Sequence, residues 1–364
     1  MVWPNSAGHP EERALVSKTV AITEVGCSLH AEAERLVLRH GGHIVQTFLL
    51  TEVDQVLLFG PVEVTHHAIM ALLRAGADLV FLTSGGSYRG RLIGRASRQV
   101  ELRVAQYDRL RNPDLAFAIA RAIVTGKIRN QRHQLLRAQS SLGDDTIAQA
   151  LARLRFLAID AQSARDREEL LGIEGAAAAA YFPAFGRAIK NPLFSFSRRT
   201  RRPPRDPVNA CLSFGYTLLG TMAEGEAAAA GLDPMLGAFH QPEYGRPSLA
   251  LDLIEELRSV IVDAVTLRLI NRRQLVPDDF ASPAEALGRD QLAEDAVTPE
   301  EGVYLALKGR KIFLSELLKR LREEVYYPPL NATLTWREIL RQQTYHLARV
   351  IRGQQERYVP FEPR

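Results

Sequence analysis

The sequence predicts an α+β fold that is predominantly α, with a small N-terminal β-rich domain followed by a large α-helical domain. Apolar residues form short, strand-like runs up to about Arg103, and after Asn112 they form long helical stretches. The 364 residues, 46% of them hydrophobic and 24% charged, suffice for two or three domains with cores of their own. This composition excludes a disordered or fibrous protein.

The change of pattern sets the expected domain boundaries. We expect a mobile tail at residues 1–17, the β-rich domain at 18–103, a linker at 104–112 and the helical domain at 113–364. The broader stretch 100–113 is the expected connector. Residues 280–301 are acidic with little apolar periodicity, which predicts a loop or insertion between helices.

Within the first domain, strands are expected at 20–23, 35–38, 43–50, 53–60 and 78–83. One helix is expected between the last two runs. Thr65 can cap its start and Gly76 can end it in the left-handed conformation. Its buried face is predicted to contain Ile69, Met70, Leu72 and Leu73. In the second domain, the clearest helical stretches are 115–128, 146–160 and 303–325.

Residues 237–258 (GAFHQPEYGRPSLALDLIEELR) place one histidine and three carboxylates at one end of a predicted helix. On this helix Asp252 and Glu256 share a face with Ser259 and Asp263, and Glu255 lies at its border. Imidazole and carboxylate ligands suit a divalent ion such as Mg²⁺ or Mn²⁺. An acidic pair on an amphipathic helix is equally typical of a solvated face, and a loop histidine often has no special role.

A second segment, LLGIEGAAAAAYFPAF, carries Glu174 between two glycines at the start of an alanine run. Alanines allow another helix to approach closely, which would hold Glu174 near the protein interior. A buried carboxylate requires a partner, and a cation is one. This segment therefore favours a metal site.

The most basic segment is SRRTRRPPRDP, in which prolines prevent a regular helix. Guanidinium groups suit phosphate oxygens, so this loop is a candidate DNA contact, with an ordinary solvated loop as the alternative. Lys127 and Arg121 are weaker candidates that fit a plain surface equally well. The arginines of the loop are Arg198, Arg199, Arg201, Arg202 and Arg205.

Net charge, cysteine content and the N-terminal sequence restrict the possible functions and locations of the protein. The 46 basic and 42 acidic residues give a net charge of only +4, so DNA binding would depend on local patches. Two isolated cysteines exclude a zinc finger or a cysteine-ligated iron–sulfur cluster and fit a reducing cytosol. The N-terminus lacks a basic start followed by an apolar core, and no apolar run has the length of a membrane span. We therefore expect a cytoplasmic protein without a membrane partner.

Three spaced segments together resemble one known family: 172–175 (GIEG), 201–219 (RRPPRDPVNACLSFGYTLL) and 237–258. The stretch 57–94 also looks like the first domain of that family and its closing strand–turn–strand. The sequence resembles the universal CRISPR endonuclease-integrase, which inserts new spacers into the repeat array in adaptive antiviral defence. The resemblance covers the chain from about residue 18 to about residue 358.

The resemblance implies that Glu174, His240 and Glu255 are the catalytic residues and metal ligands, with Asp252 as the supporting acid. The adjacent Glu256 leaves the register of the last ligand open by one residue. The implied reaction is metal-dependent transesterification, in which the 3′-hydroxyl of a DNA fragment attacks repeat DNA. With water as the nucleophile, the same site would nick DNA.

The resemblance also implies partners. It implies double-stranded DNA from the spacer fragment and the CRISPR repeat, a homodimer in which the β-rich domains meet, and a small ferredoxin-like adaptation protein. Two alternatives stay open from the residues alone. One is a metal-dependent phosphodiesterase for other substrates, and the other is a non-catalytic DNA-binding scaffold whose carboxylates pair with the arginines.

Overall fold

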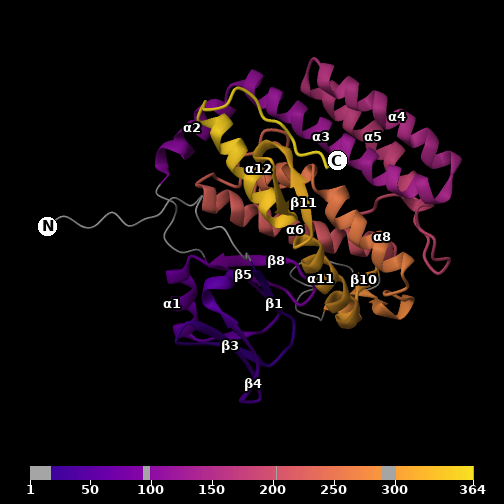
Figure 1. Ribbon diagram of the computed structural model, residues 1–364. Coiled ribbons are helices and arrows are strands. Elements are labelled where there is room, and N and C mark those ends of the chain that lie inside the picture. Colours follow the sequence, from indigo (N-terminus) through magenta and orange to yellow (C-terminus); the bar gives the residue numbers. More distant parts are fainter. Residues whose placement is uncertain (1–17, 93–98, 202, 288–300, 364) are drawn as a thin grey trace. The chain divides into compact units, whose positions relative to one another are not determined.

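A computed structural model describes residues 18–92, 99–201, 203–287 and 301–363 (Figure 1). The chain divides into two compact units, Met1–Phe81 with Arg91–Gly94 and Leu82–Gly90 with Arg95–Arg364. The first unit is β-rich and the second is mainly helical, so the predicted fold class is confirmed. The expected tail at 1–17 lies outside the described residues. Among the helices described here, none is long and apolar enough to cross a membrane.

Two four-stranded sheets make up the β-rich region. In the first sheet, of order β1-β5-β7-β8, β1 pairs in parallel with β5. In the second sheet, of order β4-β3-β2-β6, β3 pairs antiparallel with both β2 and β4. The strands are β1 (Lys18–Ile22), β2 (Cys27–Glu32), β3 (Arg35–His40), β4 (His43–Leu49), β5 (Val53–Phe59), β6 (Glu63–Val64), β7 (Asp78–Leu82) and β8 (Tyr88–Leu92).

Helix α1 (His66–Ala75) lies where the sequence predicts it. The Thr65 side chain accepts a hydrogen bond from the backbone N–H of Ala68, and Gly76 adopts φ 68° at the C-terminus. The predicted buried face is wrong at Met70, which is 39% exposed. The prediction is correct at Leu72, which is buried, and Ile69 packs against the core. Ala68 and Ala71 are also buried, because small residues allow the helix to approach strand β2 closely.

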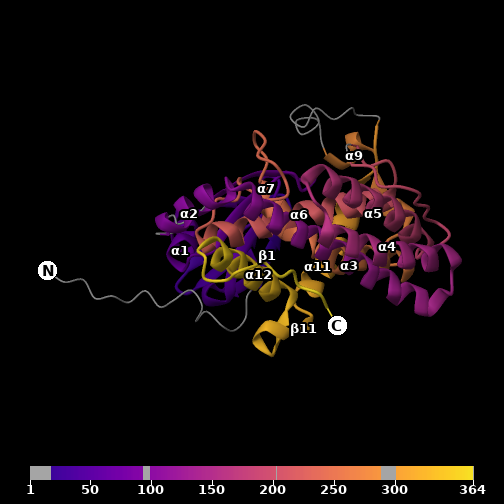
Figure 2. The same ribbon diagram turned by 90° about the horizontal axis from the view of Figure 1, so that it is seen from above.

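Helices α3 (Pro113–Leu142), α4 (Asp145–Ser163) and α5 (Arg167–Arg187) pack side by side in the helical unit (Figure 2). Each begins at a side chain that accepts backbone N–H groups, namely Asn112, Asp144 and Asp166. Helix α6 (Pro207–Ala230) begins in the same way at Asp206 and ends at Gly231 with φ 92°. The helical predictions at 115–128 and 146–160 are therefore confirmed.

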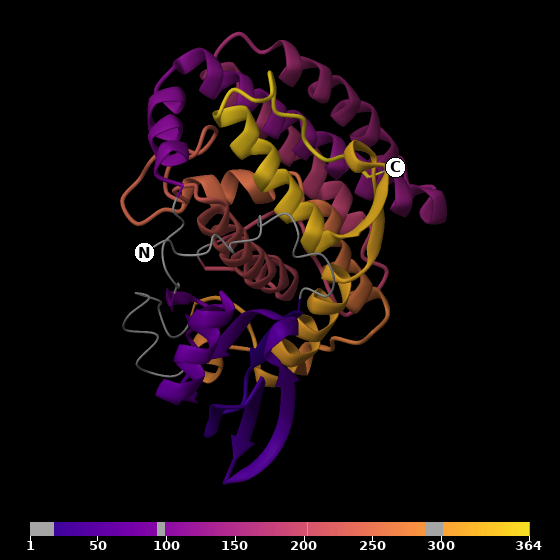
Figure 3. The ribbon, with the colours of Figure 1, turned by 60° about the vertical axis from the view of Figure 1, so that its left-hand side comes forward.

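Helix α7 (Ser248–Glu255) is followed by a π-helical turn, Ser259–Asp263, and helix α8 (Ala264–Asn271). Helix α12 (Trp336–Ile351) packs against α6 and against α2 (Val100–Leu110), and the C-terminal segment runs back along α3 (Figure 3). The remaining elements are β9 (Phe280–Ala281), α9 (Pro283–Leu287), β10 (Tyr304–Leu305), α11 (Leu307–Leu321), β11 (Glu324–Tyr327) and β12 (Ala332–Thr335), with short 3-10 turns Leu50–Glu52, Pro277–Asp279 and Pro328–Leu330.

Several expectations differ from these elements. The expected connector at 100–113 is mostly helix α2, because its leucine and glutamine at 102 and 106 are buried in the helical unit. The helical stretch expected at 303–325 is shorter, since both of its ends form strands. The loop expected at 280–301 begins with strand β9 and helix α9, and residues 288–300 lie outside the described residues.

Candidate active site

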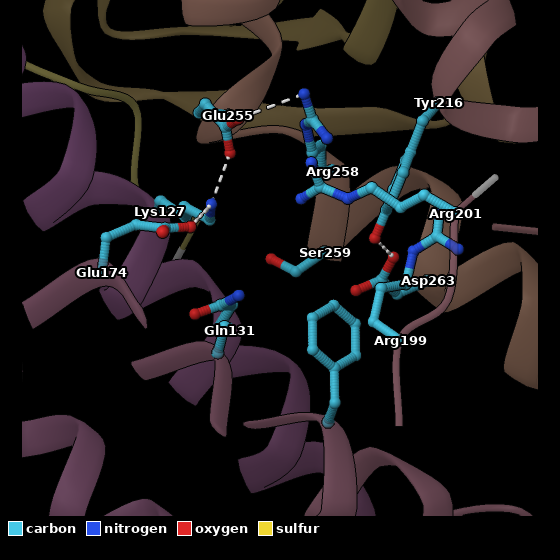
Figure 4. A pocket seen from close by; sticks show the side chains of 12 residues that line it. Lys127, Gln131, Glu174, Arg199, Arg201, Tyr216, Glu255, Arg258, Ser259 and Asp263 are labelled. Carbon is cyan, nitrogen blue, oxygen red and sulfur yellow. Dashed lines mark hydrogen bonds and ion pairs between the residues drawn. The ribbon is translucent and has the colours of Figure 1, made fainter. Parts of the chain in front are cut away.

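A pocket in the helical unit is surrounded by residues of α3, α5, α6 and the turn that follows α7 (Figure 4). Carboxylates, cations and neutral polar groups meet there, although their positions in the sequence are far apart. The lining residues are Lys127, Gln131, Glu174, Ala178, Phe182, Arg199, Arg201, Tyr216, Glu255, Arg258, Ser259 and Asp263.

Glu255 is almost completely buried in this pocket, with 3% of its side chain exposed. Its Oε2 lies 2.8 Å from Lys127 Nζ, and its Oε1 lies 3.1 Å from Arg258 Nη2. Burial by itself raises the pKa of Glu255, but the charges of Arg258 and Lys127 outweigh burial and lower the pKa to about 2. Glu255 therefore stays ionised at neutral pH.

Glu174 projects from α5 towards the same cation. Its Oε1 accepts a hydrogen bond from Lys127 Nζ, and 21% of its side chain is exposed. Burial lowers the pKa of Lys127, but the charges of Glu255 and Glu174 outweigh burial and raise it. The sequence interpretation of Lys127 as a surface or DNA-contacting residue is wrong, because its ammonium group is buried between two carboxylates from different helices.

His240 is held by Asp252. The Oδ1 atom of Asp252 lies 2.7 Å from His240 Nδ1 and accepts the backbone N–H of His240 at 2.9 Å. Its Oδ2 accepts the backbone N–H groups of Ala238 and Phe239 at 2.6 and 2.9 Å. A Cβ atom at position 237 would lie 2.7 Å from this oxygen, so glycine is required there. Asp252 therefore fixes both the loop and its imidazole.

The donor set of this site fits a divalent ion. An ionised Asp252 can only accept a hydrogen bond, so the ring proton of neutral His240 is assigned to Nδ1, which donates to Asp252 Oδ1. The free Nε2 then faces Glu255 Oε1 at 3.6 Å. One imidazole nitrogen and two carboxylates are typical ligands of Mn²⁺ and Mg²⁺. However, among the described residues no three acidic, histidine or cysteine side chains are already arranged as a metal cluster.

Glu256 faces away from the pocket, so that of the two adjacent acids Glu255 lines it. Its Oε1 accepts hydrogen bonds from Gln343 Nε2 at 2.9 Å and Tyr358 Oη at 3.1 Å. Its Oε2 accepts the backbone N–H of Phe361 at 3.1 Å. The expected common face of Asp252, Glu256, Ser259 and Asp263 is wrong, because Ser259 and Asp263 line the pocket and Glu256 does not. The regular helix ends at Glu255, and a π-helical turn follows at Ser259–Asp263.

Burial raises the pKa of Glu256 to about 8, despite its three hydrogen-bond donors. The folded state therefore binds one more proton than the unfolded state between pH about 4.5 and about 8, and this contribution to stability falls as pH rises through that range. Glutamine does not titrate, so the Glu256→Gln variant lacks this loss of stability. We therefore expect its free energy of unfolding to rise relative to that of wild type as pH increases from about 4.5 to about 8. Urea titrations from pH 5 to 9 measure it, and a constant difference contradicts the prediction.

Asp263 forms a second buried group at the pocket. Its Oδ1 accepts a hydrogen bond from Tyr216 Oη at 2.6 Å, and its Oδ2 accepts one from Tyr181 Oη at 2.7 Å. Burial raises the pKa of Asp263 to about 6. The guanidinium groups of Arg199 and Arg258 lie 5.4 and 4.9 Å from the centre of the Tyr216 ring. The tyrosines and Arg258 were not identified as site residues from the sequence.

The arginines of the loop 198–205 do not all reach the pocket. Arg199 and Arg201 line the pocket, and Arg199 donates hydrogen bonds to Asn209 Oδ1 at 2.8 Å and to Ser213 Oγ at 3.0 Å. Arg198 and Arg205 are exposed, and Arg202 lies outside the described residues. Helix α6 therefore fixes one arginine of the loop at the site.

Comparison with known proteins identifies the family. Residues 20–319 match the family described as CRISPR associated protein Cas1. The chain is 36% identical over 326 residues to a CRISPR-associated endonuclease Cas1 of Thermus thermophilus, covering 90% of this chain and 91% of the relative. The chain belongs to the Cas1 family. It is thus related to CRISPR-associated endonucleases, and the resemblance of the sequence to the CRISPR integrase is confirmed.

Two further similarities support Cas1 membership. A CRISPR-associated endonuclease Cas1 of Rhodospirillum rubrum is 37% identical over 353 residues, covering 94% of this chain and 97% of the relative. One chain of a solved partial Cas6-RT-Cas1–Cas2 complex is 26% identical, with a TM-score of 0.66 and coverage of 96% and 100%. The Cas1 fold therefore extends over nearly the whole chain.

Proposed function

We propose that this chain is a metal-dependent DNA endonuclease-integrase that joins the 3′-hydroxyl end of a DNA fragment to CRISPR repeat DNA by transesterification. The observation that carries the proposal is a pocket that is lined by Glu174, Glu255 and arginines, with His240 Nε2 lying 3.6 Å from Glu255 Oε1. Such a pocket combines ligands for a divalent ion with cations for a phosphate group. The Cas1 relatives, which are named as CRISPR-associated endonucleases, support the endonuclease part of this proposal.

In this proposal Glu174, His240 and Glu255 hold Mg²⁺ or Mn²⁺. When bound, the ion polarises a phosphate oxygen and stabilises the charge that develops during phosphoryl transfer. Asp252 keeps the imidazole oriented with Nε2 towards the site. The low pKa of Glu255, about 2, keeps its carboxylate available as a ligand at neutral pH.

Arg201 and Arg258 line the pocket and can neutralise the phosphate groups that flank the scissile bond. Two neutral groups complete the polar lining. Within the described chain, Gln131 Oε1 and Ser259 Oγ are buried without a hydrogen-bond partner, and Figure 4 shows both side chains directed into the pocket. A buried polar atom without a partner is costly, so these groups favour a polar ligand such as the attacking hydroxyl or water.

The proposal includes partners. We infer that this chain binds double-stranded spacer and repeat DNA and assembles as a homodimer in the cytoplasm. We also infer a complex with a small ferredoxin-like adaptation protein, which is supported by the similarity to a chain of a complex that is named for Cas1 and Cas2.

Strand transfer with the wild-type protein tests the reaction. A labelled duplex with 3′-hydroxyl ends is mixed with a supercoiled plasmid that bears a repeat, with Mn²⁺, Mg²⁺ or EDTA, and with a 3′-dideoxy duplex as control. We expect labelled joined plasmid only with a metal and a 3′-hydroxyl. Nicking without joining for both duplexes indicates a phosphodiesterase that uses water, and binding without either product, even with the small partner added, indicates a scaffold.

A further inference from the structure

Lys127 lies at the centre of the candidate site. Its ammonium nitrogen contacts Glu174 Oε1 and lies 2.8 Å from Glu255 Oε2, and only 11% of its side chain is exposed. The two carboxylates come from α5 and from the end of α7, whereas Lys127 comes from α3. Figure 4 shows the lysine between the two glutamates. A single buried cation thus bridges acids from two other elements.

Electrostatics explain why a cation is required there. Two carboxylates that share a site repel each other, and a buried charge without a partner is strongly destabilising. Arg258 contacts Glu255 but belongs to the same turn, so it does not connect Glu255 to Glu174. Lys127 is therefore the group that neutralises both carboxylates in the structure described here.

We propose that Lys127 is a built-in counter-cation that holds Glu174 and Glu255 in place before metal binds and competes with the metal for them. This inference rests on the proposed function, because it assumes that the two glutamates are metal ligands. On metal binding, the ammonium group gives up at least one carboxylate oxygen to the ion. Lys127 thereby stabilises the metal-free protein and weakens the binding of metal.

The two effects are linked. A ligand that binds only the folded state stabilises it, and the stabilisation grows with the logarithm of the ligand's affinity. Removing the ammonium group leaves two buried carboxylates with less compensation, so the metal-free protein becomes less stable. The same change removes the competitor, so metal binds more tightly and recovers the lost stability. A lysine with a purely structural role would lower stability without raising the affinity for metal.

The test compares wild type with Lys127→Met, which keeps the length of the side chain and removes its charge. Lys127→Gln is a second variant in case the methionine variant does not fold. Arg129→Met is the matched control, since Arg129 lies on the same helix but pairs with Glu362 through a 2.6 Å contact. Calorimetric titration with Mn²⁺ gives the affinity, and thermal unfolding in EDTA and in Mn²⁺ gives the stability.

We expect both Lys127 variants to bind Mn²⁺ about tenfold more tightly than wild type or more. They should unfold at a lower temperature in EDTA and regain most of the difference in Mn²⁺, whereas Arg129→Met should bind Mn²⁺ like wild type. Equal or weaker binding by the Lys127 variants overturns the counter-cation role. The metal site itself is still supported, even when the Lys127 variants fail this test, if wild type binds Mn²⁺ and Glu174→Gln does not. If neither wild type nor any variant binds Mn²⁺, the metal site and the inference both fail.

Discussion

Replacing Glu255 by glutamine is expected to lower the rate of metal-dependent DNA joining by at least about a thousandfold. The amide cannot provide the anionic oxygens that Glu255 directs at Lys127 and Arg258, and it is a poor ligand for a hard divalent ion. Glu174→Ala and His240→Ala should have effects of the same order, because each removes one of the three proposed ligands. The strand-transfer assay with saturating Mn²⁺ measures all three.

Glu256→Gln is the matched control for Glu255→Gln. The two residues are adjacent and carry the same side chain, but Glu256 contacts the C-terminal segment through Tyr358 and Phe361 instead of the pocket. We expect the Glu256 variant to join DNA at a rate within a few-fold of wild type. If the Glu256 variant loses joining and the Glu255 variant keeps it, the third ligand is Glu256 and the assignment is wrong.

Asp252→Ala is expected to lower the free energy of unfolding by about 3 kcal/mol or more, with a large loss of DNA joining. The buried carboxylate accepts three backbone N–H groups and contacts His240 Nδ1, and alanine leaves all four groups without this acceptor. The loss of the contact also frees the imidazole to rotate and to change tautomer. Urea denaturation measures the stability, and Mn²⁺ titration measures the effect on the site.

Glu243→Ala provides the comparison for this prediction. Glu243 lies in the same loop and pairs with Arg246 at 2.8 Å, but 68% of its side chain is exposed. Ion pairs at such exposed positions contribute little to stability. We expect no measurable change in the unfolding midpoint for this variant. Equal effects of the Asp252 and Glu243 substitutions contradict a special role for Asp252.

Local patterns were sufficient for most of the fold. Runs of apolar residues predicted β1, β3, β4, β5 and β7, and the Thr65 cap with Gly76 predicted helix α1. Strand β2 (Cys27–Glu32) was missed because its buried residues alternate with polar ones and form no continuous apolar run. Its strict alternation of buried and partly exposed residues is a signal that a period-two search can find.

The candidate site was only partly accessible from the sequence. Chemistry and the family resemblance pointed to Glu174, His240, Asp252 and Glu255. In the structure Glu174 and Glu255 line the pocket, and His240 lies beside Glu255 in contact with Asp252. The sequence analysis treats Lys127 as a surface or DNA-contacting residue, although its place in an apolar helical stretch (AIVTGKI) indicates burial. A basic residue in such a stretch requires an acidic partner, but the sequence does not specify which one.

The sequence by itself determined the class of the fold, the place of several helices with the start and end of α1, and the residue types of the site. These properties depend on neighbouring residues, through periodicity, capping and the chemistry of each side chain. Tertiary structure alone decided that Glu255 rather than Glu256 faces the pocket and that Lys127 bridges two carboxylates. Both depend on how α3, α5 and the π-helical turn after α7 pack together, and contacts between segments more than 40 residues apart are set by packing rather than by local sequence.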